Sequence, residues 1–83
     1  MHKNYPESLF DELQLLAKFP EESHLEGIKV HSDADHVFVA SAKSLFNKGL
    51  ITQMDGGYLT DRGRELSVHL HEALTLLANL TDK

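Results

Sequence analysis

The chain has 83 residues, 41% hydrophobic and 25% charged, which are the proportions of one small folded domain and leave no room for a second. It contains no cysteine, so disulfides, thiolate zinc sites and thiol nucleophiles are excluded. The formal net charge is −5, which opposes indiscriminate binding to nucleic acid.

The negative charge is unevenly distributed. Residues 1–27 hold two lysines and six acids, for −4, whereas residues 28–83 hold six bases and seven acids, for −1. The second part of the chain could therefore still present a local basic patch. The start of the chain lacks the apolar core of a signal peptide, and no apolar run is long enough to cross a membrane, so a cytoplasmic location is expected.

The first predicted element is a helix over about 6–18, with Pro6 at its first position and an apolar stripe of Leu9, Phe10, Leu13, Leu16 and Ala17. Residues 21–26 could form a short helix stopped by Gly27. Residues 28–30 have the branched side chains of a short strand that could join a neighbouring sheet.

A second clear helix is predicted over about 34–48, capped by Ser32 or Asp33 and ended by Gly49. Its apolar arc comprises Ala34, Phe38, Ala42, Leu45 and Phe46. Its opposite face comprises His36, Ala40, Lys43, Ser44 and Asn47, and no carboxylate is expected on that face beyond Asp33.

Residues 50–54 and 57–60 read as two strands of a hairpin, because Asp55-Gly56 is a typical pair for a two-residue type I′ turn. Thr60 is then well placed to cap a final helix over about 61–80. That helix carries the stripe Leu66, Leu70, Ala73, Leu74, Leu77 and Leu80, and its length of about 30 Å would carry its far end beyond the rest of the domain. An uncovered apolar end would indicate a partner.

Catalysis is not expected, because there is no phosphate-binding glycine loop, no nucleophile elbow and no isolated buried acid. No cofactor motif is present. His31, Asp33, Asp35 and His36 could in principle bind a divalent metal, but their spacing fits no established ligand pattern, so capping and surface roles are expected instead and no metal site is predicted.

The helix over 34–48 and the hairpin together are consistent with binding to double-stranded DNA, although the same polar residues would also suit an ordinary solvated helix face. His36, Lys43, Ser44 and Asn47 supply donors for base edges, and Lys48, Arg62 and Arg64 could contact phosphates. The alternative is a protein–protein interaction module on the same scaffold, which would account for the acidity.

The run LFNKGLITQMDGGYLTDRGREL resembles the C-terminal half of winged-helix domains of the MarR and PadR kind, through Leu45, Lys48-Gly49-Leu50-Ile51, Asp55-Gly56-Gly57, Leu59-Thr60 and Gly63. The segments at 27–31, 45–53 and 55–63 also resemble a small uncharacterised bacterial family commonly labelled DNA-binding. This resemblance implies an α+β, mainly helical winged-helix-like domain with a recognition helix at about 34–48 and a wing at 50–60. It also implies a transcriptional role and a homodimer formed through the terminal helices. The span from Pro20 to Ser32 leaves little room for the helix that normally precedes a recognition helix, so the helix-turn-helix is expected to be abbreviated.

Overall fold

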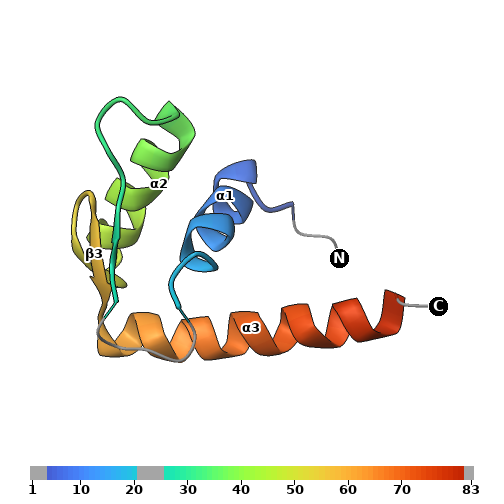
Figure 1. Cartoon of the computed structure of the whole chain (residues 1–83). Helices are drawn as coiled ribbons and strands as arrows, with labels where there is room; N and C mark the ends of the chain where they lie inside the picture. The colour runs from blue at the N-terminus through green and yellow to red at the C-terminus, as the bar shows by residue number, and fades with distance from the viewer. Residues whose placement is uncertain (1–3, 21–25, 82–83) are drawn as a thin grey trace.

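The computed structural model describes residues 4–20 and 26–81. Its elements are α1 (Glu7–Leu16), β1 (Ile28–Lys29), α2 (His36–Asn47), β2 (Ile51–Gln53), β3 (Gly56–Leu59) and α3 (Asp61–Thr81). This is an α+β, winged-helix-like fold in which a hairpin leads directly into a long helix (Figure 1). The short helix expected over 21–26 lies largely outside the described residues.

The three strands form one antiparallel sheet in the order β1-β3-β2. β1 therefore joins the free edge of the hairpin, with Ile28 opposite Gly57 and Lys29 opposite Gly56, which confirms the strand predicted at 28–30. Between β1 and the hairpin the chain forms a single helix, α2, because residues 31–34 make only a turn closed by the bond from Ala34 N to His31 O. No helix occurs within residues 26–35, and the rest of the span expected to be abbreviated lies largely outside the described residues.

The core is formed mainly by two helices and the start of the hairpin. Seven hydrophobic side chains are buried: Leu15, Leu16, Phe19, Ala42, Leu45, Leu50 and Ile51. Leu66 and Leu70 of α3 pack against this cluster, so only the first half of α3 is anchored on the body of the domain.

The predicted stripe of α1 was wrong in part. Leu15 is 1% exposed at the centre of the core, whereas Phe10 is 55% exposed. The face that packs on α2 is Glu12, Leu15, Leu16 and Phe19, which lie at positions i, i+3, i+4 and i+7. This rotation brings a carboxylate, Glu12, into the contact between the two helices. The N-terminus of α1 also differs, because Pro6 is the N-cap and not the first helical residue.

The N-cap of α2 is also different from the expected Ser32 or Asp33. The turn at residues 31–34 delays the helix, and Asp35 caps it by accepting a hydrogen bond from Val37 N at 3.0 Å. At the other end Gly49 takes φ +78°, as expected for a residue that ends a helix.

The hairpin exists as predicted, but the type I′ turn was wrong. Its two loop residues are Met54 and Asp55, neither with positive φ, and the positive φ angles fall on Gly56 and Gly57. The register with β2 instead shifts between Gly56 and Leu59, where Gly57 and Tyr58 of β3 lie opposite Thr52 alone. Asp55 is held by the residue that follows β1, because its backbone oxygen accepts a hydrogen bond from Val30 N at 2.7 Å.

Candidate nucleic-acid interface

The outward side of α2 is a ridge of four exposed residues: His36, Ala40, Lys43 and Asn47. Their spacing places them within one narrow stripe, opposite the buried residues Ser41, Ala42 and Leu45. No acidic residue occurs anywhere in α2. This set, called the α2 ridge below, offers an imidazole, an ammonium and an amide on the surface of the helix.

Ser44, predicted to lie with these residues, is turned toward α1. Its hydroxyl donates to Glu12 Oε2 at 2.5 Å, and the ammonium of Lys48 donates to Glu12 Oε1 at 2.7 Å. The Glu12 side chain is about 10% exposed, so its charge needs both partners. Ser44 and Lys48 therefore hold α1 against α2. The exposed face of α2 itself carries no carboxylate, as expected, but Glu12 of α1 lies beside it.

Arg62 and Arg64, predicted as phosphate contacts, lie in the first turn of α3. Arg64 is ion-paired with Asp61, and it also donates to Leu59 O at 3.5 Å. Arg62 is exposed and makes no ion pair with any described residue. Figure 1 shows that α3 begins beside the C-terminal end of α2. Asn47, at the end of α2, is therefore the residue of the ridge nearest these arginines. His36 lies at the other end of the helix, which is about 18 Å long for 12 residues.

The tip of the hairpin carries a further ion pair. The ammonium of Lys29 donates to Asp55 Oδ2 at 2.7 Å, and this hydrogen bond is the main cause that lowers the pKa of Asp55 below its usual value of 3.8. Partial desolvation opposes the shift, and the charges of Lys29 and His31 add to it. The tip is thus electrically neutral and fastened to β1.

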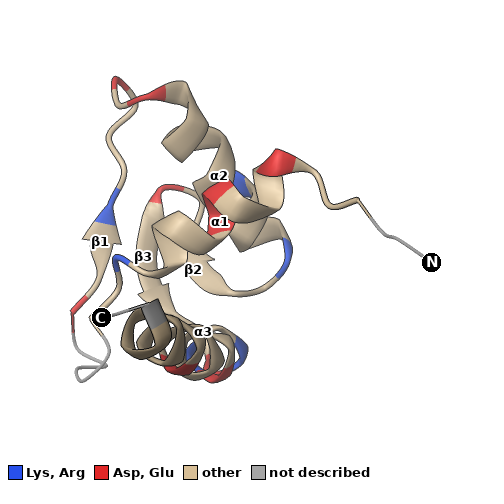
Figure 2. Cartoon of the chain, turned by 90° about the vertical axis from the view of Figure 1, so that its right-hand side faces the viewer, with Lys and Arg blue, Asp and Glu red and all other residues tan. Residues whose placement is uncertain are grey.

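The positive residues are spread over several elements. Figure 2 shows blue segments on β1, on α2 and on α3, and not on one side of the molecule. Lys29, Lys48 and Arg64 are each paired with a carboxylate. Within the described part of the chain, Lys43 and Arg62 are the predicted cations that form no ion pair with a carboxylate.

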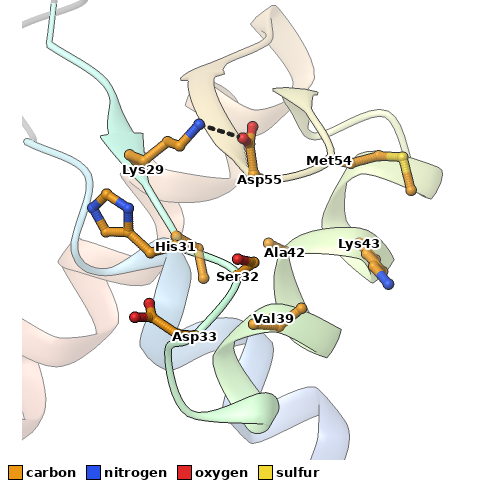
Figure 3. A pocket seen from close by; sticks show the side chains of 10 residues that line it. Lys29, His31, Ser32, Asp33, Val39, Ala42, Lys43, Met54 and Asp55 are labelled. Carbon is orange, nitrogen blue, oxygen red and sulfur yellow. Dashed lines mark hydrogen bonds and ion pairs between the residues drawn. The ribbon is translucent and has the colours of Figure 1, made fainter.

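Two grooves flank the α2 ridge. The groove toward the hairpin has a volume of about 580 Å³ and is lined by Lys29, Val30, His31, Ser32, Asp33, Val39, Ala42, Lys43, Met54 and Asp55. Figure 3 shows Lys43 at its edge, pointing away from the Lys29–Asp55 pair. The groove toward α1 is lined by Ser8, Asp11, Glu12, His36, Val37, Ala40, Ser41 and Ser44, so one flank of the ridge is acidic. The α2 ridge thus separates the groove toward the hairpin from the groove toward α1.

Residues 31–36 do not come together as a metal site. Nowhere in residues 4–20 and 26–81 do three or more His, Cys, Asp or Glu side chains gather closely enough to hold a metal ion. Asp35 serves as the helix cap, one of the roles expected for these acids. Among the same residues, no helix is long and apolar enough to span a bilayer.

Glu12 is the one important residue at this site that sequence reasoning missed. The available signal was its spacing from Leu15 and Leu16, which places it on the same face. A carboxylate there predicts a buried hydrogen-bonding partner, because an unpaired charge would be costly.

The comparisons with known proteins give the family. No curated protein and no solved structure matches the chain significantly. One family model matches residues 3–78, which is nearly the whole chain. The chain belongs to the family described as "Family of unknown function (DUF5669)".

Proposed function

We propose that the chain binds double-stranded DNA by inserting the α2 ridge into the major groove, in a transcriptional role. The observation that carries the proposal is a 12-residue helix with no acidic residue, in a chain of net charge −5, that exposes His36, Lys43 and Asn47 in one stripe. Asn and Lys side chains donate to the base edges of the major groove, and Ala40 between them leaves room for close approach.

The contact set is smaller than the one predicted from the sequence. Ser44 and Lys48 could reach DNA only by leaving Glu12, and Arg64 only by leaving Asp61. The proposal therefore rests on His36, Lys43 and Asn47 for the groove and on Arg62 for phosphate. Since the tip of the hairpin is neutralised by the Lys29–Asp55 pair, we assign no phosphate contact to it.

The test is a fluorescence-anisotropy titration with a mixed-sequence duplex at low salt, comparing wild type with Lys43→Ala and Lys29→Ala. Both variants remove one positive charge, but only Lys43 lies on the α2 ridge. We expect Lys43→Ala to weaken binding by about 5-fold or more and Lys29→Ala by about 2-fold or less. Equal losses would mean that only overall charge matters, and no binding by wild type would end the proposal.

A protein–protein interaction module is the second candidate. It is favoured by a different observation, the row of exposed leucines at the far end of α3. The two functions differ in salt dependence, because phosphate contacts weaken steeply as ionic strength rises while apolar contacts do not. Binding to a protein that persists in high salt, without detectable DNA binding at low salt, would favour this second candidate.

A further inference from the structure

The α2 ridge presents its side chains in a fixed order along the helix. At about 3.6 residues per turn, His36, Ala40, Lys43 and Asn47 lie within an arc of about 60°. At a rise of about 1.5 Å per residue, the part from Ala40 to Asn47 is about 10 Å long, which equals about three base-pair steps of about 3.4 Å each. The ridge therefore meets several neighbouring base pairs, one after another.

Charge decides which part of the ridge approaches DNA most closely. Asp11, a carboxylate with no ion pair among the described residues, lines the same groove as His36, so phosphates are repelled near the start of α2. Arg62 lies in the first turn of α3, which begins beside the other end of α2 (Figure 1). It makes no ion pair with any described residue and attracts phosphate there. Residues 40–47 are therefore the part that enters the groove.

The three ridge side chains in this part differ in what they recognise. Lysine donates to O6 and N7 of guanine, and asparagine makes two hydrogen bonds with N6 and N7 of adenine. Alanine has no polar side-chain atom, and its methyl group contacts the methyl group of thymine. The side chains of Lys43 and Asn47 form no hydrogen bond with another described residue, so their donors are available for a base.

We infer that the α2 ridge reads a site in which one G·C pair lies between two A·T pairs, all within about four base pairs. This inference rests on the proposed binding to DNA. Lys43 contacts the guanine of the central pair, because it lies between Ala40 and Asn47 on the helix. Asn47 contacts the adenine of one outer pair, and Ala40 contacts the thymine methyl of the other. The two outer pairs have the same composition but are recognised by different groups.

Selection from randomised duplexes at low salt, by wild type and by variants of the ridge, tests the assignment. We expect wild type to enrich a central G·C pair between two A·T pairs. Lys43→Gln should change the preferred central pair to A·T, because glutamine pairs with adenine. Asn47→Ser should reduce the preference for one outer A·T pair by about 5-fold or more, because serine bonds to more than one base.

Arg62→Gln is the matched control for Lys43→Gln. It also replaces one cation by an amide, but at a position assigned to phosphate, so it should weaken binding to all duplexes alike and leave the preferred site unchanged. All three substituted side chains are exposed, and circular dichroism checks that each variant is folded.

Uracil in place of thymine tests the contact of Ala40 without any change in the protein. It removes one methyl group from the DNA and keeps the hydrogen-bonding groups of the base. We expect uracil to weaken binding by less than about 2-fold at the outer pair that Asn47→Ser affects, and by about 4-fold at the other outer pair. Equal effects at the two outer pairs would contradict the contact of Ala40.

The outcomes of the selection separate this inference from the proposed function. Binding without a preferred site, or with a preferred site that neither Lys43→Gln nor Asn47→Ser changes, would overturn the base assignment while DNA binding itself stands. If wild type recovers no DNA at low salt, the proposed function fails, and the inference fails with it.

Discussion

Glu12 lies on the side of α1 that faces α2, and its carboxylate decides the position of two other side chains. It accepts hydrogen bonds from the side chains of Ser44 and Lys48, so both side chains point toward α1 and not toward a bound DNA. Helical periodicity predicted which side of α2 is exposed, and His36, Ala40, Lys43 and Asn47 are all exposed. It could not predict which residue of another helix would bond to Ser44 at the border of that side, because such pairing depends on how the helices pack.

The first prediction concerns the stability provided by the Glu12 cluster. Lys48→Met leaves the nearly buried Glu12 carboxylate with only the Ser44 hydroxyl, so we expect a loss of about 1–3 kcal/mol in the free energy of unfolding. Lys43→Met also removes one positive charge, from α2, but it breaks no hydrogen bond or ion pair, and we expect a change within about 0.5 kcal/mol. Urea unfolding followed by circular dichroism measures both. Equal effects of the two substitutions would show that the Glu12 cluster contributes nothing specific.

A second prediction at this scale concerns Asp55. The hydrogen bond from Lys29 lowers the pKa of Asp55 in the folded state. The pair therefore stabilises the fold above pH about 3.8, the pKa of the unfolded state, and this contribution is lost as pH falls through the lower pKa of the folded state. We expect NMR titration to place the Asp55 midpoint below 3.8 in wild type and to move it toward 3.8 in Lys29→Gln. An unchanged midpoint in that variant would argue against the pair in solution.

At the scale of elements, the junction of the hairpin with α3 is where sequence and structure agree best. The Thr60 hydroxyl accepts a hydrogen bond from Gly63 N at 3.1 Å, so Thr60 caps α3 as predicted. The same hydroxyl donates to Gly49 O at 2.7 Å, which connects the start of α3 to the end of α2. The leucine-threonine pair and the glycine three residues later, which carry part of the resemblance to winged-helix domains, therefore have structural roles here. This junction could be predicted because capping and helix ends are local.

The type I′ turn could not be predicted for a related reason. Asp55-Gly56 is locally suited to that turn, but β1 pairs with β3, and Val30, the residue after β1, donates a hydrogen bond to the backbone oxygen of Asp55. That contact comes from residues 25 positions earlier in the chain. It is a non-local constraint that overrides the local preference of a dipeptide.

Gly63→Ala tests the close contact at this junction. A Cβ at position 63 would collide with the backbone carbonyl of Leu50. In an open helix the same change would stabilise by roughly 1 kcal/mol through helix propensity. We therefore expect the opposite sign, a loss of about 2 kcal/mol or more in the free energy of unfolding, because backbone must move. Thermal unfolding would measure it, and a raised Tm would show that the junction is looser than the structure indicates.

At the scale of the whole molecule, the α2 ridge and the bare half of α3 are two separate surfaces with different chemistry. The ridge is polar and carries positive charge, whereas the end of α3 is apolar and nearly uncharged. Because Lys29, Lys48 and Arg64 are each paired with a carboxylate, few cations are left for phosphate, and we expect the affinity for DNA to be modest.

The most direct test of the account is the slope of log K against log salt concentration for duplex binding. Each neutralised phosphate contributes about −0.9 to this slope. With Arg62 as the phosphate contact, the proposal predicts a slope of about −0.9 for wild type. The variant Arg62→Ala, which lacks this contact, should give a slope closer to zero. No measurable binding by wild type at low salt, or a slope near zero, would contradict DNA binding through the α2 ridge.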